Sequence, residues 1–112
     1  VRLDGLGCFG GDKPRAVYIA ASTNAGLGAL QHAHERVAHG AGLPAETRKF
    51  TPHATLARLR GTRAGAVAGF LADMGVVAFE PYQADEFYLL SSRPGSGGGP
   101  YVVEDVYPAT DL

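Results

Sequence analysis

Glycine and proline residues divide this chain into short segments, and this punctuation limits the length of every helix and strand. The 112 residues include 16 glycines and 7 prolines, which cluster at residues 10–14, 40–44 and 95–100. Glycine favours tight turns, and proline cannot continue a helix or a central strand. A chain of this length forms one domain at most. The pattern therefore predicts a single domain over residues 1–112, built from short elements.

The segments between these breaks alternate between strand-like and helix-like patterns. Strands are expected over residues 3–9, 15–21, 53–59, 76–80, 84–91 and 101–107. Helices are expected over residues 25–39 and 63–73, the first capped by Ser22, Thr23 or Asn24. The inward face of the second helix is expected to carry Val67, Phe70, Leu71 and Met74. This order of elements predicts an α+β fold, with two helices against an antiparallel or mixed sheet.

Composition narrows the class of protein. Cys8 is the single cysteine, so the chain can form no internal disulfide, and we expect a cytoplasmic protein in a reducing compartment. No apolar run reaches the length of a membrane span. The first residues have neither the basic nor the apolar region of a signal peptide. We therefore expect no membrane partner.

Positive charge is concentrated in one part of the sequence. The net charge is only −1, yet five of the ten lysines and arginines fall between residues 48 and 63, where there is no Asp or Glu. These residues are Arg48, Lys49, Arg58, Arg60 and Arg63. Such a cluster is either a solvated rim or a local positive field for a phosphate.

His53 and Thr55 are the pair of residues best suited to chemistry, and they lie inside this basic window. On a strand, residues two positions apart project from the same face. That face would present an imidazole able to move a proton near neutral pH, beside a hydroxyl able to bind a phosphoryl oxygen. Ala54 and Leu56 are expected to point the other way, into the core. The spacing predicts half of a phosphoryl-transfer site.

Two other patterns are weaker indications of a functional site: a possible zinc site and a glycine-rich stretch. His32, Glu35 and His39 would share one helix face, as a zinc site requires, but their spacing departs from compact zinc motifs and favours a solvated face. Residues 95–99 are rich in glycine but lack the Gly-Lys-Ser/Thr ending of a phosphate loop, so they predict a hairpin connection. We therefore expect no metal and no cofactor.

The nine residues from Phe50 to Arg58 read Phe-Thr-Pro-His-Ala-Thr-Leu-Ala-Arg. This segment resembles the second signature of the two-histidine (2H) phosphoesterase superfamily, in particular the bacterial RNA 2′,3′-cyclic phosphodiesterases, also called 2′-5′ RNA ligases. Residues 3–9 and 15–21 resemble the central hairpin of that family. Residues 87–92, the glycine-rich stretch and Tyr101 resemble its closing strands.

The resemblance implies an enzyme that acts on RNA termini or nucleotides ending in a 2′,3′-cyclic phosphate. His53 matches the family's proton acceptor and Thr55 its hydroxyl donor. Arg58 is expected to bind the phosphate. Strict alternation, however, puts it on the face of Ala54, away from Thr55. Either the strand ends or bulges before Arg58, or Arg58 contacts the RNA backbone at the rim. Phe50 either stacks on a base or packs in the core.

Family members carry two His-x-Thr motifs in two lobes, and this chain carries one. It therefore resembles the C-terminal part of the enzyme, one lobe plus part of a bilobal fold, with the first motif-bearing segment absent. Activity is then expected of the intact protein, with the isolated chain weak or inactive. Two other interpretations stay open. The chain is either a noncatalytic module that binds phosphorylated nucleotides or RNA ends, or it completes its site with the absent segment or a second copy.

Overall fold

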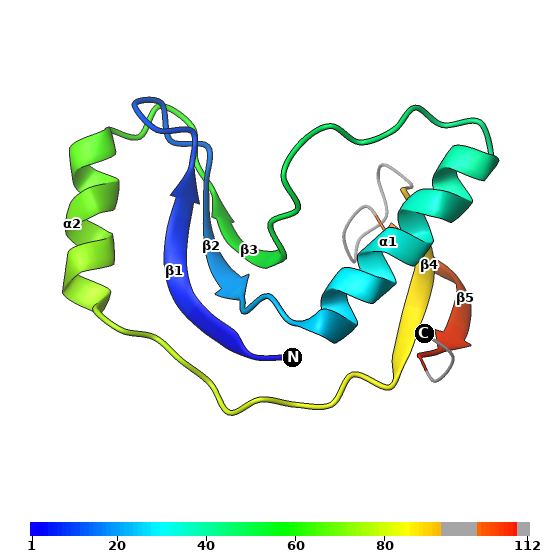
Figure 1. The fold of residues 1–112 in the computed structure, drawn as a ribbon. Coiled ribbons are helices and arrows are strands. Elements are labelled where there is room, and N and C mark those ends of the chain that lie inside the picture. The colour runs from blue at the N-terminus through cyan, green and yellow to red at the C-terminus, as the bar shows by residue number, and fades with distance from the viewer. Residues whose placement is uncertain (93–100, 110–112) are drawn as a thin grey trace. The chain divides into compact units, whose positions relative to one another are not determined.

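The computed structural model describes residues 1–92 and 101–109. Among these residues its elements follow the order ββαβαββ, which lacks one of the strands expected from the sequence (Figure 1). The strands are β1 (Leu3–Phe9), β2 (Ala16–Ala21), β3 (His53–Arg58), β4 (Glu86–Ser92) and β5 (Tyr101–Pro108). The helices are α1 (Ala25–Gly40) and α2 (Ala64–Met74). The α+β class is confirmed, and the predicted 95–99 connection lies outside the described residues.

Strands β1, β2 and β3 form an antiparallel sheet with β2 in the centre (Figure 1). The predicted strand over residues 76–80 is wrong. This segment makes one isolated bridge, between Asp4 and Ala78, and single hydrogen bonds such as that from the Gly5 N–H to the Val77 carbonyl. A bulge in β1 between Leu3 and Leu6 interrupts regular pairing along that edge, so the segment follows β1 without forming a regular ladder.

Helix α1 has well-defined signals at both ends. The Asn24 side chain accepts a hydrogen bond from the Leu27 N–H at 2.9 Å, which selects Asn24 among the three predicted caps. At the other end, the N–H of Leu43 donates to the Ala38 carbonyl and that of Gly42 to the His39 carbonyl. This is a Schellman motif, and the positive φ of Gly42, 95°, is the conformation that it requires. The chain then leaves α1 toward β3 through residues 41–52.

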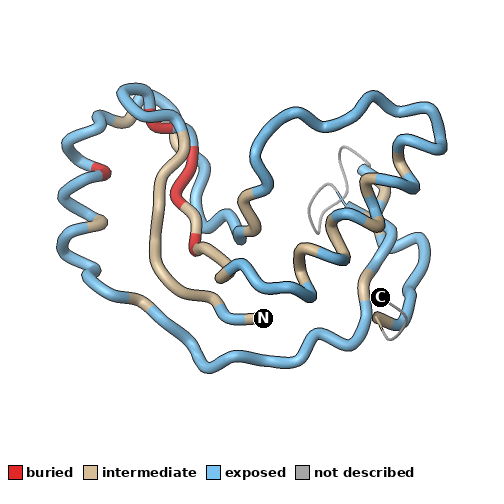
Figure 2. The backbone as a smooth tube through the Cα atoms, viewed as in Figure 1, coloured by how far each residue is buried: buried red, intermediate tan, exposed pale blue. Residues whose placement is uncertain are grey.

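The buried residues of the described part centre on β2, where Val17 and Ile19 share one face and Ala16 lies on the other (Figure 2). The buried apolar residues of the described part are Ala16, Val17, Ile19 and Val67. Val67 is the buried residue of α2, which contacts β1. The expectation that Phe70 and Met74 also face inward is wrong, because they are 47% and 49% exposed. Within the described residues, Val67 is thus the side chain of α2 that is fully covered.

Ala54 and Leu56 also differ from expectation. Both are exposed, Leu56 to 59%, and all of β3 is exposed. β3 is an edge strand of its sheet, and no described helix covers its far face. The opposite face of β3, where His53 lies, is exposed as well.

The chain divides into two compact units, Val1–Tyr82 and Gln83–Leu112. In the second unit, β4 and β5 pair as antiparallel strands. The rings of Phe87 and Tyr107 stack with centroids 5.3 Å apart, and the Ser91 hydroxyl donates to Glu104 at 2.5 Å. The candidate site described below lies wholly within the first unit. Within the described residues, no helix is long and apolar enough to cross a membrane.

Candidate functional site

Strand β3 presents His53 and Thr55 on the same face. In the sheet register, His53 lies opposite Ala20, Thr55 opposite Tyr18, and the intervening Ala54 opposite Ile19, which belongs to the core face. Side chains opposite each other in neighbouring strands share a face of the sheet. The imidazole and the hydroxyl are therefore neighbours on the face away from the core. Both residues are exposed.

A β-bulge brings Arg58 to that face as well. Tyr18 pairs with Thr55, but the preceding residue, Val17, pairs with Ala57. One step along β2 thus matches two steps along β3, and Leu56 is the extra residue. The extra residue reverses the alternation, so Arg58 falls opposite Ala16, on the side of Thr55.

The His53 ring is held by the backbone before it. Its Nδ1 lies 2.6 Å from the carbonyl oxygen of Thr51. A carbonyl oxygen can only accept, so Nδ1 carries the proton, and in the neutral ring the lone pair is on Nε2. The next carbonyl, that of Pro52, accepts from the Ala21 N–H at 2.9 Å and ties this segment to β2. The ring therefore has a defined orientation and a defined basic nitrogen.

Two aromatic rings pack beside His53. Phe9 and Tyr18 stack on each other with centroids 4.3 Å apart. The imidazole meets both edge-on, at 4.9 Å from Phe9 and 5.5 Å from Tyr18. Tyr18 in turn covers Gly7, where a Cβ atom would collide with the tyrosine Cζ and hydroxyl. A glycine in β1 thus makes room for the tyrosine that packs against the histidine.

A cavity of about 840 Å³ opens on this face. His53, Thr55, Arg58 and Phe50, the predicted site residues, all line it. Its other walls come from the β1–β2 hairpin, from α1 and from the loop that follows α1; they include Phe9, Arg15, Ala16, Gln31, Glu35, Glu46, Arg48, Lys49 and Thr51. The volume is within the range of roughly 300–1,000 Å³ that is usual for small-molecule sites.

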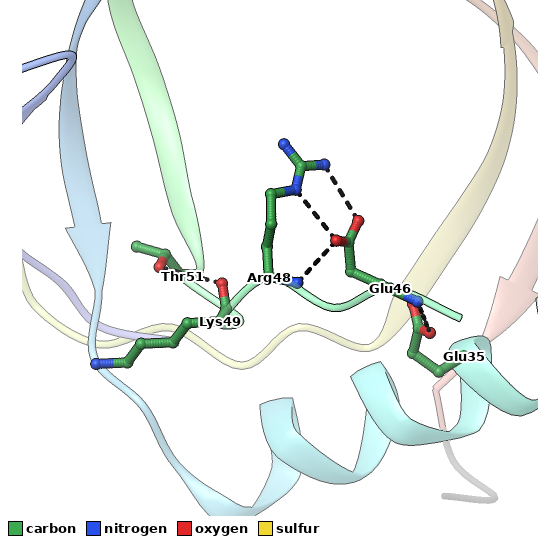
Figure 3. Close-up of polar contacts among 5 residues, drawn as sticks. All are labelled: Glu35, Glu46, Arg48, Lys49 and Thr51. Carbon is green, nitrogen blue, oxygen red and sulfur yellow. Dashed lines mark hydrogen bonds and ion pairs between the residues drawn. The ribbon is translucent and has the colours of Figure 1, made fainter. Parts of the chain in front are cut away.

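The charged groups of the cavity fall into two sets. Arg15 immediately precedes β2, Arg58 is the last residue of β3, and neither makes an ion pair within the described residues. Arg48 is paired with Glu46, whose carboxylate lies 3.1 Å from the Arg48 Nε (Figure 3). The hydrogen bonds from Arg48 lower the pKa of Glu46 to about 2. The cavity therefore has two guanidinium groups without an ion pair among the described residues and one that is already neutralised, and Lys49 and Glu35 also line it.

The described residues do not gather the helix-face histidines into a cluster of possible metal ligands. Among residues 1–92 and 101–109, no group of three or more His, Cys, Asp or Glu side chains is placed to hold a metal ion. Glu35 instead lies against the loop after α1, where its Oε2 accepts from the Glu46 N–H at 3.4 Å (Figure 3). Neither His32 nor His39 lines the cavity.

Several residues that line the cavity are not predicted from the sequence, among them Arg15, Phe9 and Glu46. Arg15 and Phe9 flank the turn of the first hairpin, and their position beside β3 depends on a sheet register that local patterns do not give. Glu46 lies outside the basic window, and its pairing with Arg48 is a loop contact. The available signal was the pairing of residues 3–9 with 15–21, which places the two ends of this hairpin together.

Comparison with known proteins identifies the family of this chain. A family model described as LigT like Phosphoesterase matches residues 17–101. The chain is 38% identical over 95 residues to a protein of Aeropyrum pernix named RNA 2′,3′-cyclic phosphodiesterase. The alignment covers 82% of this chain and 54% of that protein, so the chain spans about half the length of this curated relative. No solved structure matches the chain.

The fold is α+β, and its edge strand β3 presents an imidazole, a hydroxyl and a guanidinium to one cavity. This arrangement fits the phosphoesterases as a class. With the match over residues 17–101 and the 38% identity, the chain belongs to the LigT-like phosphoesterase family. The resemblance to the 2H phosphoesterase superfamily is thereby confirmed.

Proposed function

We propose that the protein hydrolyses the 2′,3′-cyclic phosphate of an RNA end or a nucleotide to a 2′-phosphate. The reverse reaction would join such an end to a 5′-hydroxyl through a 2′-5′ linkage. The observation that carries the proposal is the shared face of β3, where His53, Thr55 and Arg58 line one cavity. The name of the Aeropyrum pernix relative supports the same reaction.

In this proposal His53 is the general base. Nδ1 donates to the Thr51 carbonyl, which leaves Nε2 to take a proton from the attacking water. The water oxygen forms a bond to phosphorus, the bond from phosphorus to the 3′-oxygen breaks, and that oxygen must gain a proton. General acid–base groups of this kind typically contribute 10²–10⁴-fold each.

A second imidazole is needed as the acid, because one ring cannot serve both sides of an in-line displacement. Among the described residues that line the cavity, His53 is the one histidine. We propose that the acid comes from a segment outside these 112 residues, consistent with the one-lobe organisation expected from the sequence. A second copy of the chain is the other possible source, and sedimentation of the intact protein tests it, since a strict monomer excludes it.

Thr55 and Arg58 would stabilise the charge that develops on phosphorus oxygens. The Thr55 hydroxyl donates to a nonbridging oxygen. The Arg58 guanidinium can bind phosphate through two parallel hydrogen bonds, and it makes no ion pair within the described residues that would occupy it. Phe50 is 41% exposed at the cavity, which leaves its ring available to stack on a nucleobase.

One observation favours a second candidate, a noncatalytic module that binds phosphorylated RNA ends. The described cavity holds a single histidine, and binding a phosphate needs only the basic residues and Thr55. Such a module would retain adenosine 2′-phosphate but would not turn over a cyclic phosphate.

Incubation of the intact protein with adenosine 2′,3′-cyclic phosphate in ¹⁸O-labelled water separates the two candidates. Phosphorus NMR should show adenosine 2′-phosphate as the product, with the label in the phosphate group. Binding of adenosine 2′-phosphate without hydrolysis would establish the module. A 3′-phosphate product would contradict the proposed direction of ring opening.

A further inference from the structure

Glu46 and Arg48 form an ion pair at the wall of the cavity, on the loop between α1 and β3 (Figure 3). The Nε and Nη2 atoms of Arg48 each donate to one carboxylate oxygen at 3.1 Å. The backbone N–H of Arg48 also donates to Glu46, at 2.9 Å. One carboxylate thus occupies one side of the guanidinium, and Nη1 makes no hydrogen bond within the described residues.

The carboxylate of Glu46 occupies two side-by-side donors of Arg48. Two parallel N–H donors to two oxygens is the arrangement that arginine uses for carboxylate and for phosphate alike. The Arg48 side chain is 86% exposed and that of Glu46 41%, so a ligand in the cavity can reach the pair. Ion pairs at this exposure contribute little to stability. An incoming phosphate could therefore replace Glu46 at small cost.

Arg48 is separate from the arginine assigned to the reacting phosphate. Arg58 ends β3 and shares a face with Thr55, whereas Arg48 belongs to the preceding loop. Both line the same cavity, whose volume of about 840 Å³ is in the upper part of the usual range. The cavity thus has room and donors for a ligand with more than one phosphate.

We propose that Arg48 binds a second phosphate of an RNA strand, the phosphodiester next to the cyclic end, and that Glu46 competes with this phosphate for the guanidinium. The inference rests on the proposed function, because it takes the reacting phosphate to lie beside His53. It makes Arg48 a residue that favours oligonucleotides over mononucleotides, and Glu46 the residue that limits this preference.

The test compares two product analogues by titration calorimetry on the intact protein. One is adenosine 2′-phosphate, and the other is a 3′-5′-linked diadenosine that ends in a 2′-phosphate. Arg48→Gln should weaken binding of the dinucleotide about fivefold and leave that of the mononucleotide unchanged. It should also flatten the plot of log affinity against log salt for the dinucleotide by about 0.7, the slope for one phosphate of a single strand.

Glu46→Gln should strengthen binding of the dinucleotide about threefold, because the neutral amide no longer neutralises Arg48. In the double variant with Arg48→Gln this gain should disappear, because Glu46 acts through Arg48. Arg60→Gln is the matched control. It removes an exposed arginine of the same basic window that does not line the cavity, and it should change neither affinity.

Each alternative outcome has a distinct meaning. Equal losses for both nucleotides, or no loss, in Arg48→Gln would overturn the second phosphate site alone. A gain from Glu46→Gln that persists without Arg48 would show general repulsion and overturn the competition. If the wild-type protein bound neither nucleotide, the proposed function itself would fail, and this inference with it. Unchanged mononucleotide affinity in the variants verifies that they are folded.

Discussion

Thr55 and Arg58 share one face of β3 although three positions separate them, because Leu56 is an extra residue at a bulge. Regular alternation would have placed the guanidinium on the opposite face from the hydroxyl. Bulges often lie beside active sites, where they redirect a side chain. In this chain the bulge directs Arg58 to the cavity that His53 lines.

Replacing Arg58 tests whether this geometry matters for activity. We expect Arg58→Gln to reduce kcat/KM at least tenfold, since hydrogen bonds to charged groups contribute roughly 1.5–3 kcal/mol. Arg58→Lys should recover only part of the loss, because an ammonium cannot bind phosphate side-on. Steady-state hydrolysis of a 2′,3′-cyclic nucleotide measures both. Full activity of either variant would mean that Arg58 does not bind the reacting phosphate.

Gly7 is expected to control His53 through Tyr18. A methyl group at Gly7 would collide with the tyrosine ring, which packs on Phe9 and on the imidazole. Gly7→Ala should therefore displace Tyr18 and lower kcat several-fold, with a smaller effect on KM. The His53 ring proton resonances should shift with it.

Gly69→Ala is the control for Gly7→Ala. Gly69 lies within α2 and a Cβ there would meet nothing within 4 Å. Replacing it should stabilise the helix by roughly 0.5–1 kcal/mol and leave kcat unchanged. Normal kcat in Gly7→Ala would contradict the link between Tyr18 and the histidine.

The Glu46–Arg48 pair should respond to acid. The folded-state pKa of Glu46 is lowered to about 2 from 4.5, chiefly by the side-chain hydrogen bond from Arg48. The pair's contribution to stability is therefore present above pH 4.5 and is lost as the pH falls toward 2. That contribution is small because both groups are exposed. Carbon-detected NMR should give the low midpoint, and Arg48→Gln should return it toward 4.5; a midpoint near 4.5 in the wild type would contradict the pairing.

The small core makes β2 sensitive to truncation. Ile19 is 4% exposed on the central strand, and Ile→Ala changes in cores cost roughly 2–5 kcal/mol. Val76, at 92% exposed, provides the comparison, and Val76→Ala should change the free energy of unfolding by less than about 0.5 kcal/mol. Urea denaturation measures both. Similar values for the two variants would mean that the core lies elsewhere.

The sequence predicted those parts of the structure that depend on local signals. Both helices and their positions follow from periodicity, and side-chain chemistry narrows the cap of α1 to Ser22, Thr23 or Asn24, of which the structure uses Asn24. The shared face of His53 and Thr55 follows from strand alternation alone. The family signature from Phe50 to Arg58 contains all four predicted site residues, and all four line the cavity.

What the sequence could not predict depends on register and on packing partners. The sequence alone leaves the bulge at Leu56 as one of several possibilities for Arg58, because an extra residue is defined only against the neighbouring strand. The burial of Phe70 and Leu56 was wrongly expected, since periodicity shows which face is apolar but not what covers it. Arg15 lines the cavity because of the register of the first hairpin, and local propensities do not determine that register.

The central claim, that His53 is the proton acceptor of a phosphoesterase, is tested most directly by turnover of a 2′,3′-cyclic nucleotide. His53→Gln in the intact protein should lower kcat by about 10²–10⁴-fold while binding of a 2′-phosphate product weakens far less. His39→Gln, at an exposed α1 residue that does not line the cavity, should turn over normally. Near-normal turnover in His53→Gln would contradict the account.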